Sequence, residues 1–345
     1  MLSTKLILNL FVEGTISLRT AYYGGKMDEL IKKALEELIE NEDTDLYMEL
    51  LQQMDIHEPA FAEAALKKEI FYPALLYKDA STEVRDELIH RLDKELSEEE
   101  IDTLDINGML LALSAIGDER VVETFQRWEK NPPKWREKVY VGPMGYAMEG
   151  GWCIENGTKK NLSFDVCYAI EKQENYEEDQ SVHGGLSEEK CPYCESKYVD
   201  ILSLDGTDER LSFLGVNGNL KIRTCLSCIC YGGFIFCKYD ENGESKIVYQ
   251  EDGYGDEIED EDLELEADFV ISQKPVSPYH CAECEESAIG GVAQFVDDAS
   301  YAICPECGKR MKHFAQLGEE YTGCGTIYVQ ICPECRIAAT SFQQT

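Results

Sequence analysis

The chain has 345 residues, and its 68 acidic side chains against 32 basic ones give a net charge of −36 at pH 7. A chain this acidic repels nucleic-acid phosphates and anionic lipid surfaces, so we expect neither nucleic acid nor a membrane among its partners. The length is that of two or three domains, and a hydrophobic content of 43% is enough for folded cores.

The first 26 residues differ from the rest of the chain. Their apolar run, Leu6–Val12, is too short to span a membrane and lacks the small-residue cleavage site of a secretory signal. The first strong helical pattern begins at Met27, just after Gly24–Gly25, whose codons can spell a ribosome-binding sequence. We therefore expect residues 1–26 to be a poorly ordered arm or the product of a mis-assigned start, and the protein to be cytoplasmic.

Residues 27–130 show the period of amphipathic helices and predict a helical lobe. The first two apolar stripes consist of Leu30, Ile31, Ala34, Leu35, Leu38 and Ile39, and of Leu46, Leu50, Leu51 and Met54. Pro59 is expected to open a third helix, because proline is tolerated at a helix start. Further along, Gly117 is expected to end one helix and Asp118 to cap the next.

Within this lobe, residues 60–130 resemble HEAT-type helical repeats. Asp79 with Val84–Arg85 matches the start of such a repeat, and Ala115–Asp118 with Val121–Val122 matches its inter-helix turn. The resemblance implies a helical scaffold that presents a face to another protein.

The pattern changes at Asn131–Pro133, where two prolines are expected to end the helical part. Alternating apolar residues and three Asn-Gly dipeptides, which favour hairpin turns, then predict a β-rich region over residues 131–250. Segments 234–238 and 246–250 flank one of these dipeptides and are expected to pair as a hairpin.

An acidic segment follows at residues 251–268, in which eleven of eighteen residues are Asp or Glu and none is basic. Because like charges at this density resist compaction, we expect a mobile acidic linker. It separates the first β-rich region from a C-terminal β-rich zinc domain at residues 269–345.

Ten of the fifteen cysteines lie in five C-x-x-C pairs, all after residue 190. Two thiolates at this spacing bind one metal ion from a single turn, and a second pair completes a tetrahedron. In a long chain without a secretory signal, the spacing favours metal over disulfides. We predict two structural zinc ions in zinc-ribbon-like sites. The first site would consist of Cys191, Cys194, Cys225 and Cys228, and the second of Cys304, Cys307, Cys332 and Cys335.

The fifth pair, Cys281 and Cys284, leaves the pairing of the last three motifs open. It could share an ion with Cys304 and Cys307, consist of two plain thiols, or belong to a third metal site. Additional ligands for a third site would be His280, Cys324 or Cys230. Among the unpaired cysteines, an apolar or strand-like context predicts core positions for Cys153, Cys167, Cys230 and Cys237.

No catalytic or cofactor-binding residue is predicted. Four-cysteine sites leave no open coordination position, and the chain contains no H-E-x-x-H, P-loop, G-x-S-x-G or dinucleotide-binding motif. His313 is the one histidine near a favoured cysteine pair, and we expect it to be packed or on the surface. The alternative is a zinc-dependent or thiol-redox enzyme using Cys281 with Cys284, or Cys324; a further alternative is a protein that buffers zinc.

Residues 286–345 contain several short motifs in a fixed order. These are Ile289–Gly291, Cys304–Lys309, Gln316–Leu317, Ile327–Tyr328, Cys332–Cys335 and Phe342–Gln344. On these residues the chain resembles the YwqG-like family of uncharacterised bacterial proteins and the C-terminal domain of programmed-cell-death-protein-2-like proteins. The resemblance implies a β-rich fold. Its eukaryotic branch implies chaperone-like capture of a basic ribosomal protein, and its bacterial branch implies toxin-immunity proteins.

Together these patterns predict an α+β protein, with a HEAT-like helical lobe followed by a β-rich part that two four-cysteine zinc sites hold together. We expect a non-enzymatic binding module. Its strong negative charge favours a basic protein as the partner.

Overall fold

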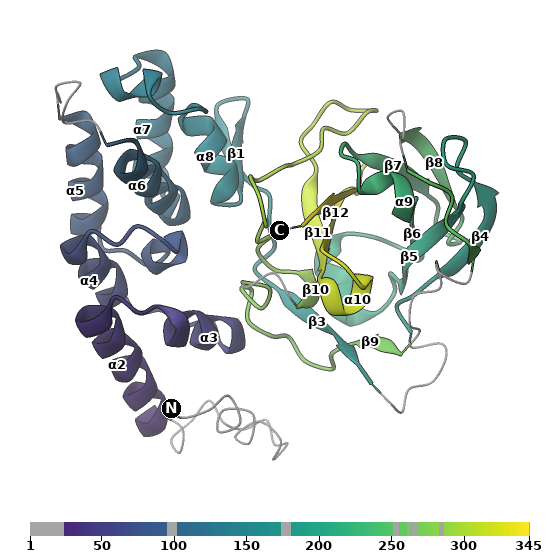
Figure 1. The fold of residues 1–345 in the computed structure, drawn as a ribbon, viewed down its shortest axis with the longest axis horizontal. Coiled ribbons are helices and arrows are strands. Elements are labelled where there is room, and N and C mark those ends of the chain that lie inside the picture. The colour runs from purple at the N-terminus through teal and green to yellow at the C-terminus, as the bar shows by residue number, and fades with distance from the viewer. Residues whose placement is uncertain are drawn as a thin grey trace.

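The computed structural model describes residues 24–94, 102–173, 181–250, 255–260, 263, 268–282 and 286–344. The predicted N-terminal arm therefore lies almost wholly outside the described residues, and so does Cys284 of the fifth cysteine pair. The first described helix begins at Gly24, three residues before Met27. The described residues combine an N-terminal helical lobe with a β-rich lobe, as the sequence predicts (Figure 1).

The helices of the N-terminal lobe stack side by side along one end of the molecule (Figure 1). They are α2 (Gly24–Asn41), α3 (Asp45–Gln53), α4 (Ala60–Lys68), α5 (Thr82–Asp93), α6 (Thr103–Ile116), α7 (Glu119–Lys130) and α8 (Pro143–Glu149), with short 3-10 turns η1 (Ala74–Tyr77) and η2 (Lys134–Glu137). Leu38, Leu50 and Leu51 from the predicted stripes are fully buried in the core of this lobe. Pro59 stands at the cap of α4, at the helix start predicted for it.

The turn between α6 and α7 has the predicted structure. Gly117 adopts a φ of 53°, a left-handed conformation that glycine tolerates without strain, and the Asp118 carboxylate accepts the Val121 N–H at 2.9 Å. Asp118 also receives the Arg85 guanidinium at 2.6 Å, which ties α5 to the start of α7. One carboxylate thus caps a helix and joins two helices.

The helical lobe extends past Asn131–Pro133, where the sequence predicted its end. The prolines interrupt the helix but do not send the chain elsewhere, because Trp135 is buried and donates its indole N–H to the Leu92 carbonyl at 2.8 Å. Its ring meets Trp128 edge to face at 5.4 Å between ring centroids. The lobe ends only after α8.

Among the described residues, the strands form three antiparallel sheets. A small hairpin pairs β1 (Trp152–Glu155) with β2 (Thr158–Asn161). A three-stranded sheet has the order β4 (Gly185–Lys190), β5 (Lys197–Asp205), β6 (Asn219–Thr224). An eight-stranded sheet has the order β8 (Ser245–Gln250), β7 (Ile235–Tyr239), β13 (Ile337–Gln343), β12 (Thr326–Cys332), β11 (Lys312–Leu317), β10 (Ser287–Gly290), β3 (Cys167–Lys172), β9 (Phe269–Ile271). The predicted hairpin is β7 with β8.

The large sheet joins strands from both sides of the acidic segment. Strand β7 pairs with β13, and β3 pairs with both β10 and β9. The regions 131–250 and 269–345, which the sequence divides at the acidic segment, therefore build one sheet together. That sheet and the three-stranded sheet share a core in which Ile201, Ile289 and Val329 are completely buried.

The described part of the acidic segment is packed against the protein and is not a mobile linker there. Leu263 is buried in the main β core, and Ile258 packs against that core. The Ile258 N–H donates to Ser196 at 2.8 Å, and Asp260 pairs with Lys197 at 2.8 Å. These apolar contacts and this ion pair keep the described part of the acidic segment packed despite its high density of negative charge.

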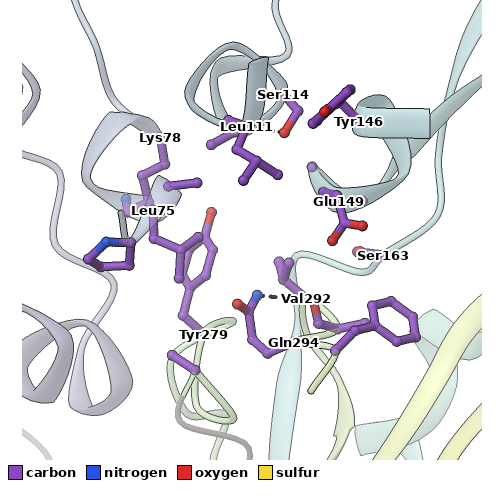
Figure 2. A pocket seen from close by; sticks show the side chains of 18 of the residues that line it. Leu75, Lys78, Leu111, Ser114, Tyr146, Glu149, Ser163, Tyr279, Val292 and Gln294 are labelled. Carbon is purple, nitrogen blue, oxygen red and sulfur yellow. Dashed lines mark hydrogen bonds between the residues drawn. The ribbon is translucent and has the colours of Figure 1, made fainter. Parts of the chain in front are cut away.

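A large cavity, here called the interlobe cleft, lies between the helical and β-rich lobes (Figure 2). It has a volume of about 1060 Å³ and is lined by residues of α3, η1, α6 and α8 on one side, and by Tyr279 and residues 292–298 on the other. Two hydrogen bonds hold the lobes together beside the cleft. The Trp152 indole N–H donates to the Ser114 carbonyl at 2.9 Å, and the Ser277 hydroxyl donates to the Leu51 carbonyl at 2.6 Å.

Candidate functional site

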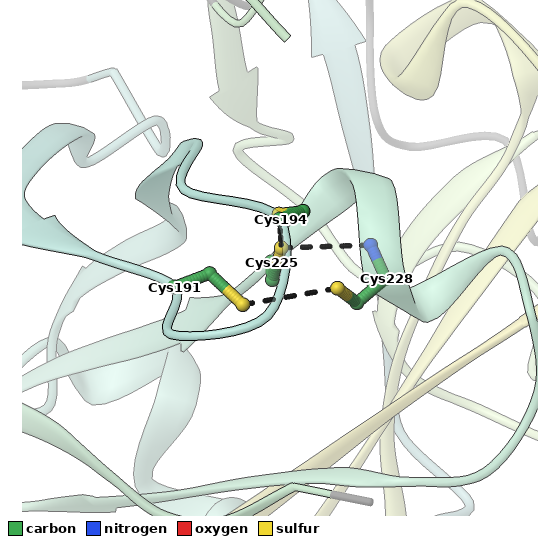
Figure 3. A group of neighbouring side chains, drawn as sticks. All are labelled: Cys191, Cys194, Cys225 and Cys228. Atoms are coloured by element: carbon green, nitrogen blue, oxygen red, sulfur yellow. Dashed lines mark hydrogen bonds between the residues drawn. The ribbon is translucent and has the colours of Figure 1, made fainter. Parts of the chain in front are cut away.

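The first predicted cysteine site is a compact group of four sulfur atoms in the β-rich lobe (Figure 3). The Cys191 and Cys228 sulfurs are 3.7 Å apart, and the Cys194 and Cys225 sulfurs are 3.4 Å apart. Four thiolates around one tetrahedral zinc ion, each at about 2.3 Å, would be about 3.8 Å from one another. The observed separations fit such an ion, and they are far longer than a disulfide bond of about 2.05 Å.

Two different local structures supply these sulfurs. Cys191 and Cys194 lie in the turn between β4 and β5, where Glu195 takes a left-handed φ of 64° and its N–H returns to the Cys191 carbonyl at 3.0 Å. Cys225 ends strand β6 and caps the short helix α9 (Leu226–Ile229) by accepting the Cys228 N–H at 3.5 Å. The predicted strand does lead into the second pair. That pair begins a helical turn, however, and not the second β-hairpin of a zinc ribbon.

Burial shapes the electrostatics of this cluster. All four cysteines are at most 5% exposed and belong to the main β core. Burial raises the pKa of Cys225 and raises that of Cys228 to about 11. Burial also acts to raise the pKa of Cys191, but hydrogen bonds from backbone N–H groups and from Gln250 outweigh it and lower the pKa to about 7. Because burial disfavours the charged forms of Cys225 and Cys228, four thiolates together in this cluster would need a positive ion at its centre.

The second predicted site is also assembled. Cys304, Cys307, Cys332 and Cys335 form a group with all sulfurs within 4.8 Å of one another, and Cys307 lies 3.7 Å from Cys332. This finding resolves the pairing of the last motifs, since Cys304 and Cys307 meet the Cys332 pair and not Cys281. None of the eight cysteines in the two clusters is in a disulfide.

Two similar turns build the second cluster. Gly308 follows Cys307 with a φ of 69° and donates to the Cys304 carbonyl at 2.9 Å, and Arg336 follows Cys335 with a φ of 54° between β12 and β13. The residue after the second cysteine is left-handed here and at Glu195 in the first cluster, so three of the four pairs use the same backbone turn. Glycine is the least strained residue at such a position.

The two clusters differ in solvent access. In the second, Cys307 is exposed and Cys335 is half-buried, while Cys304 and Cys332 are buried in a small core beside Phe236 and Met311. The pKa of Cys307 is lowered, chiefly by the Lys309 N–H. An ion in the second cluster would be reachable from solvent, whereas an ion in the first would be enclosed.

The other cysteines considered above and His313 are either buried or exposed. Cys281 is buried in a small core that also contains Cys167, and it belongs to neither four-cysteine group among the described residues. Cys324 is exposed, as is Cys230, which was predicted to be a core residue. Cys153, Cys167 and Cys237 are buried as predicted. His313 is packed, and burial lowers its pKa to about 3, so the imidazole is neutral.

Sequence reasoning missed the carboxylates of the interlobe cleft. Glu149 lies on α8 and accepts the Ala299 N–H at 2.8 Å across the lobe boundary. Burial raises its pKa, with Asp298 adding to the effect and the Ala299 hydrogen bond opposing it. No motif marks these residues, because the lobes bring together positions far apart in the chain.

Comparison with known proteins gives one informative match. The chain is 32% identical over 287 residues to a Salmonella typhimurium protein named uncharacterized protein YpfL, an alignment that covers 79% of this chain and 65% of the relative. The chain thus spans less than two thirds of that relative's length. No protein-family model matches the chain, and no solved structure does. The similarity is consistent with a bacterial family of unknown function.

None of the helices that the structure describes has both the length and the apolar character that a bilayer span requires.

Proposed function

We propose that the protein is a non-catalytic, zinc-stabilised binding module that sequesters a basic protein, as an immunity protein or a dedicated chaperone would. It would act in the cytoplasm, with a HEAT-like helical lobe as part of its binding surface. The proposal is supported by one combination of features: two four-cysteine clusters, which would leave a bound ion no open coordination position, in a chain with a net charge of −36. Closed clusters stabilise structure, and the charge selects a basic partner.

Zinc is the proposed metal because four cysteine thiolates in a tetrahedron are its common structural ligand set. Bound zinc would supply folding free energy to the turns that carry the cysteines. The left-handed turns after Cys194, Cys307 and Cys335 support this role, since they direct two sulfurs to one point.

A pull-down from the native host at low and high salt tests the binding role. A defined basic protein that is captured at low salt and released at high salt supports the proposal, because exposed charge pairs are screened by salt. Failure to recover any specific protein at low salt contradicts it.

Metal counting with thiol titration separates this function from its alternatives. Two tightly held zinc ions and no fast-reacting thiol fit a binding module. The exposed Cys307 gives a specific reason to consider zinc buffering, which a readily exchanged second ion would favour. Rapid alkylation of Cys281, Cys284 or Cys324 would favour a thiol-redox enzyme.

A further inference from the structure

We propose that the interlobe cleft binds a lysine- and arginine-containing segment of a partner protein. This inference rests on the proposed function, because it names the place where a basic partner docks. It depends on the lining of the cleft and not on the overall charge of the chain.

The first observation is the sign of the charges in the cleft. Five lining residues are carboxylates: Asp45, Glu149, Asp165, Asp297 and Asp298. None of the five forms a salt bridge with a described residue. Four of them are exposed, and Glu149 lies deeper, facing the cavity from the side opposite Tyr279 (Figure 2). A concave surface on which one sign of charge predominates focuses its field on an oppositely charged ligand.

The two lysines of the cleft do not neutralise these carboxylates. The Lys78 ammonium donates to the Ile56 carbonyl at 2.6 Å and pairs with Asp55 at 3.5 Å and with Asp79. Lys159 donates to the Gly117 carbonyl, and its ammonium lies 5.3 Å from the ring centre of Trp152. Both ammonium groups thus contact groups other than the five carboxylates. These carboxylates therefore remain available to cations of a ligand.

The second observation is the aromatic rim. Tyr72 and Tyr140 line the cleft from the helical lobe and are 82% and 97% exposed, and Val141 beside them is 40% exposed. Exposed tyrosines are enriched at the centres of protein interfaces, and their faces stack with arginine guanidinium groups. A bare acidic cluster would attract any cation. The tyrosine rim adds contact area suited to side chains of a protein.

The third observation is size. A volume of about 1060 Å³ lies just above the ~300–1,000 Å³ range of small-molecule sites. A peptide segment with basic side chains fills this space better than a single small cation.

The test measures binding of a fluorescein-labelled peptide of alternating lysine, arginine and glycine to the zinc-loaded full chain. A peptide with glutamine at each basic position is the reference. The cleft variant Asp297→Lys/Asp298→Lys is compared with the control variant Glu319→Lys/Glu320→Lys. The control pair is also exposed, lies outside the cleft, and gives the same change in net charge.

We expect the cleft variant to weaken binding of the basic peptide by about tenfold or more, and the control by less than about twofold. Tyr140→Ala, at a position too exposed to affect folding, is expected to weaken it about threefold. Equal losses in cleft and control variants would refute the proposal, because only the overall charge would then matter. Preference for the glutamine peptide, or tighter cleft-dependent binding of spermine than of the peptide, would also refute it.

The same variants keep this inference distinct from the proposed function. If the pull-down partner binds the wild type and the cleft variant equally, the cleft is not its docking site, although the protein still sequesters a basic partner. If the wild type captures no partner, the proposed function fails regardless of how the cleft variant behaves.

Discussion

Replacing Cys225 by serine should unfold the β-rich lobe, whereas replacing Cys335 should not. Cys225 is 0% exposed, and its sulfur is 3.4 Å from that of Cys194 in the middle of the main core. The serine hydroxyl is a poor zinc ligand and would itself be an unsatisfied polar group in that core, at a cost of about 1–3 kcal/mol.

The loss of the ion is the larger effect. A structural zinc site contributes on the order of 10 kcal/mol of apparent folding free energy, against a total domain stability of about 5–15 kcal/mol. Cys225→Ser should therefore abolish the cooperative thermal transition of the β-rich lobe. Cys335 is half-buried at the edge of a small core, and β12 and β13 keep their seven paired positions without it. Its replacement should lower Tm by about 5–10 °C, the shift that about 2–3 kcal/mol produces in a domain of this size.

Circular dichroism melting together with zinc counting by mass spectrometry measures both effects. For Cys335→Ser the expected result is a single cooperative melt, with the second ion still held by the three remaining cysteines of its cluster. For Cys225→Ser no cooperative melt is expected. The same zinc content and Tm in Cys225→Ser as in the wild type would show that Cys225 holds no ion that stabilises the fold.

Three further predictions concern access, packing and pH. A soluble chelator should remove zinc from the second cluster before the first, in two kinetic phases followed by absorbance; simultaneous release would contradict the difference in burial. Trp152→Phe should cost about 1–3 kcal/mol in urea unfolding, because the Ser114 carbonyl loses its donor inside the lobe joint; a loss below about 0.5 kcal/mol would mean that water replaces the indole. Burial acts to raise the pKa of Asp93, but hydrogen bonds from Arg127 and Trp128 outweigh it and lower the pKa. The stabilisation from Asp93 should therefore be complete above the unfolded pKa of about 3.9 and disappear as pH falls through the folded value, so Asp93→Asn should destabilise the protein at neutral pH but not in strong acid.

Local signals in the sequence predicted the parts of the fold that local contacts determine. Gly117 and Asp118 identify their turn because a left-handed residue and a capping carboxylate act within a few residues. The cysteine spacing identified each C-x-x-C pair for the same reason, because its two thiols lie three residues apart. It could not decide the pairing of the last three motifs, since that depends on β11, β12 and β13 meeting in one sheet.

The failures of sequence reasoning share a physical cause. The acidic segment was predicted to be mobile from its charge count, but the packing of Ile258 and Leu263, together with the Asp260–Lys197 ion pair, anchors its described part. Asn131–Pro133 marks a break in a helix, and only the burial of Trp135 shows that the lobe continues. The cleft has no sequence signature, because Glu149 and Asp298 become neighbours only when the two lobes pack together.

The strand order of the large sheet has a consequence for synthesis. Strands β12 and β13 lie at the centre of that sheet, between β7 and β11, yet they are translated after every other strand in it. While residues 326–343 are still inside the ribosome, β7 has emerged without β13, the neighbour that joins it to the rest of the sheet. The cysteines of the first cluster are all available by residue 228. The nascent chain can thus bind one metal ion early, whereas the edge of β7 stays unpaired until β12 and β13 have emerged.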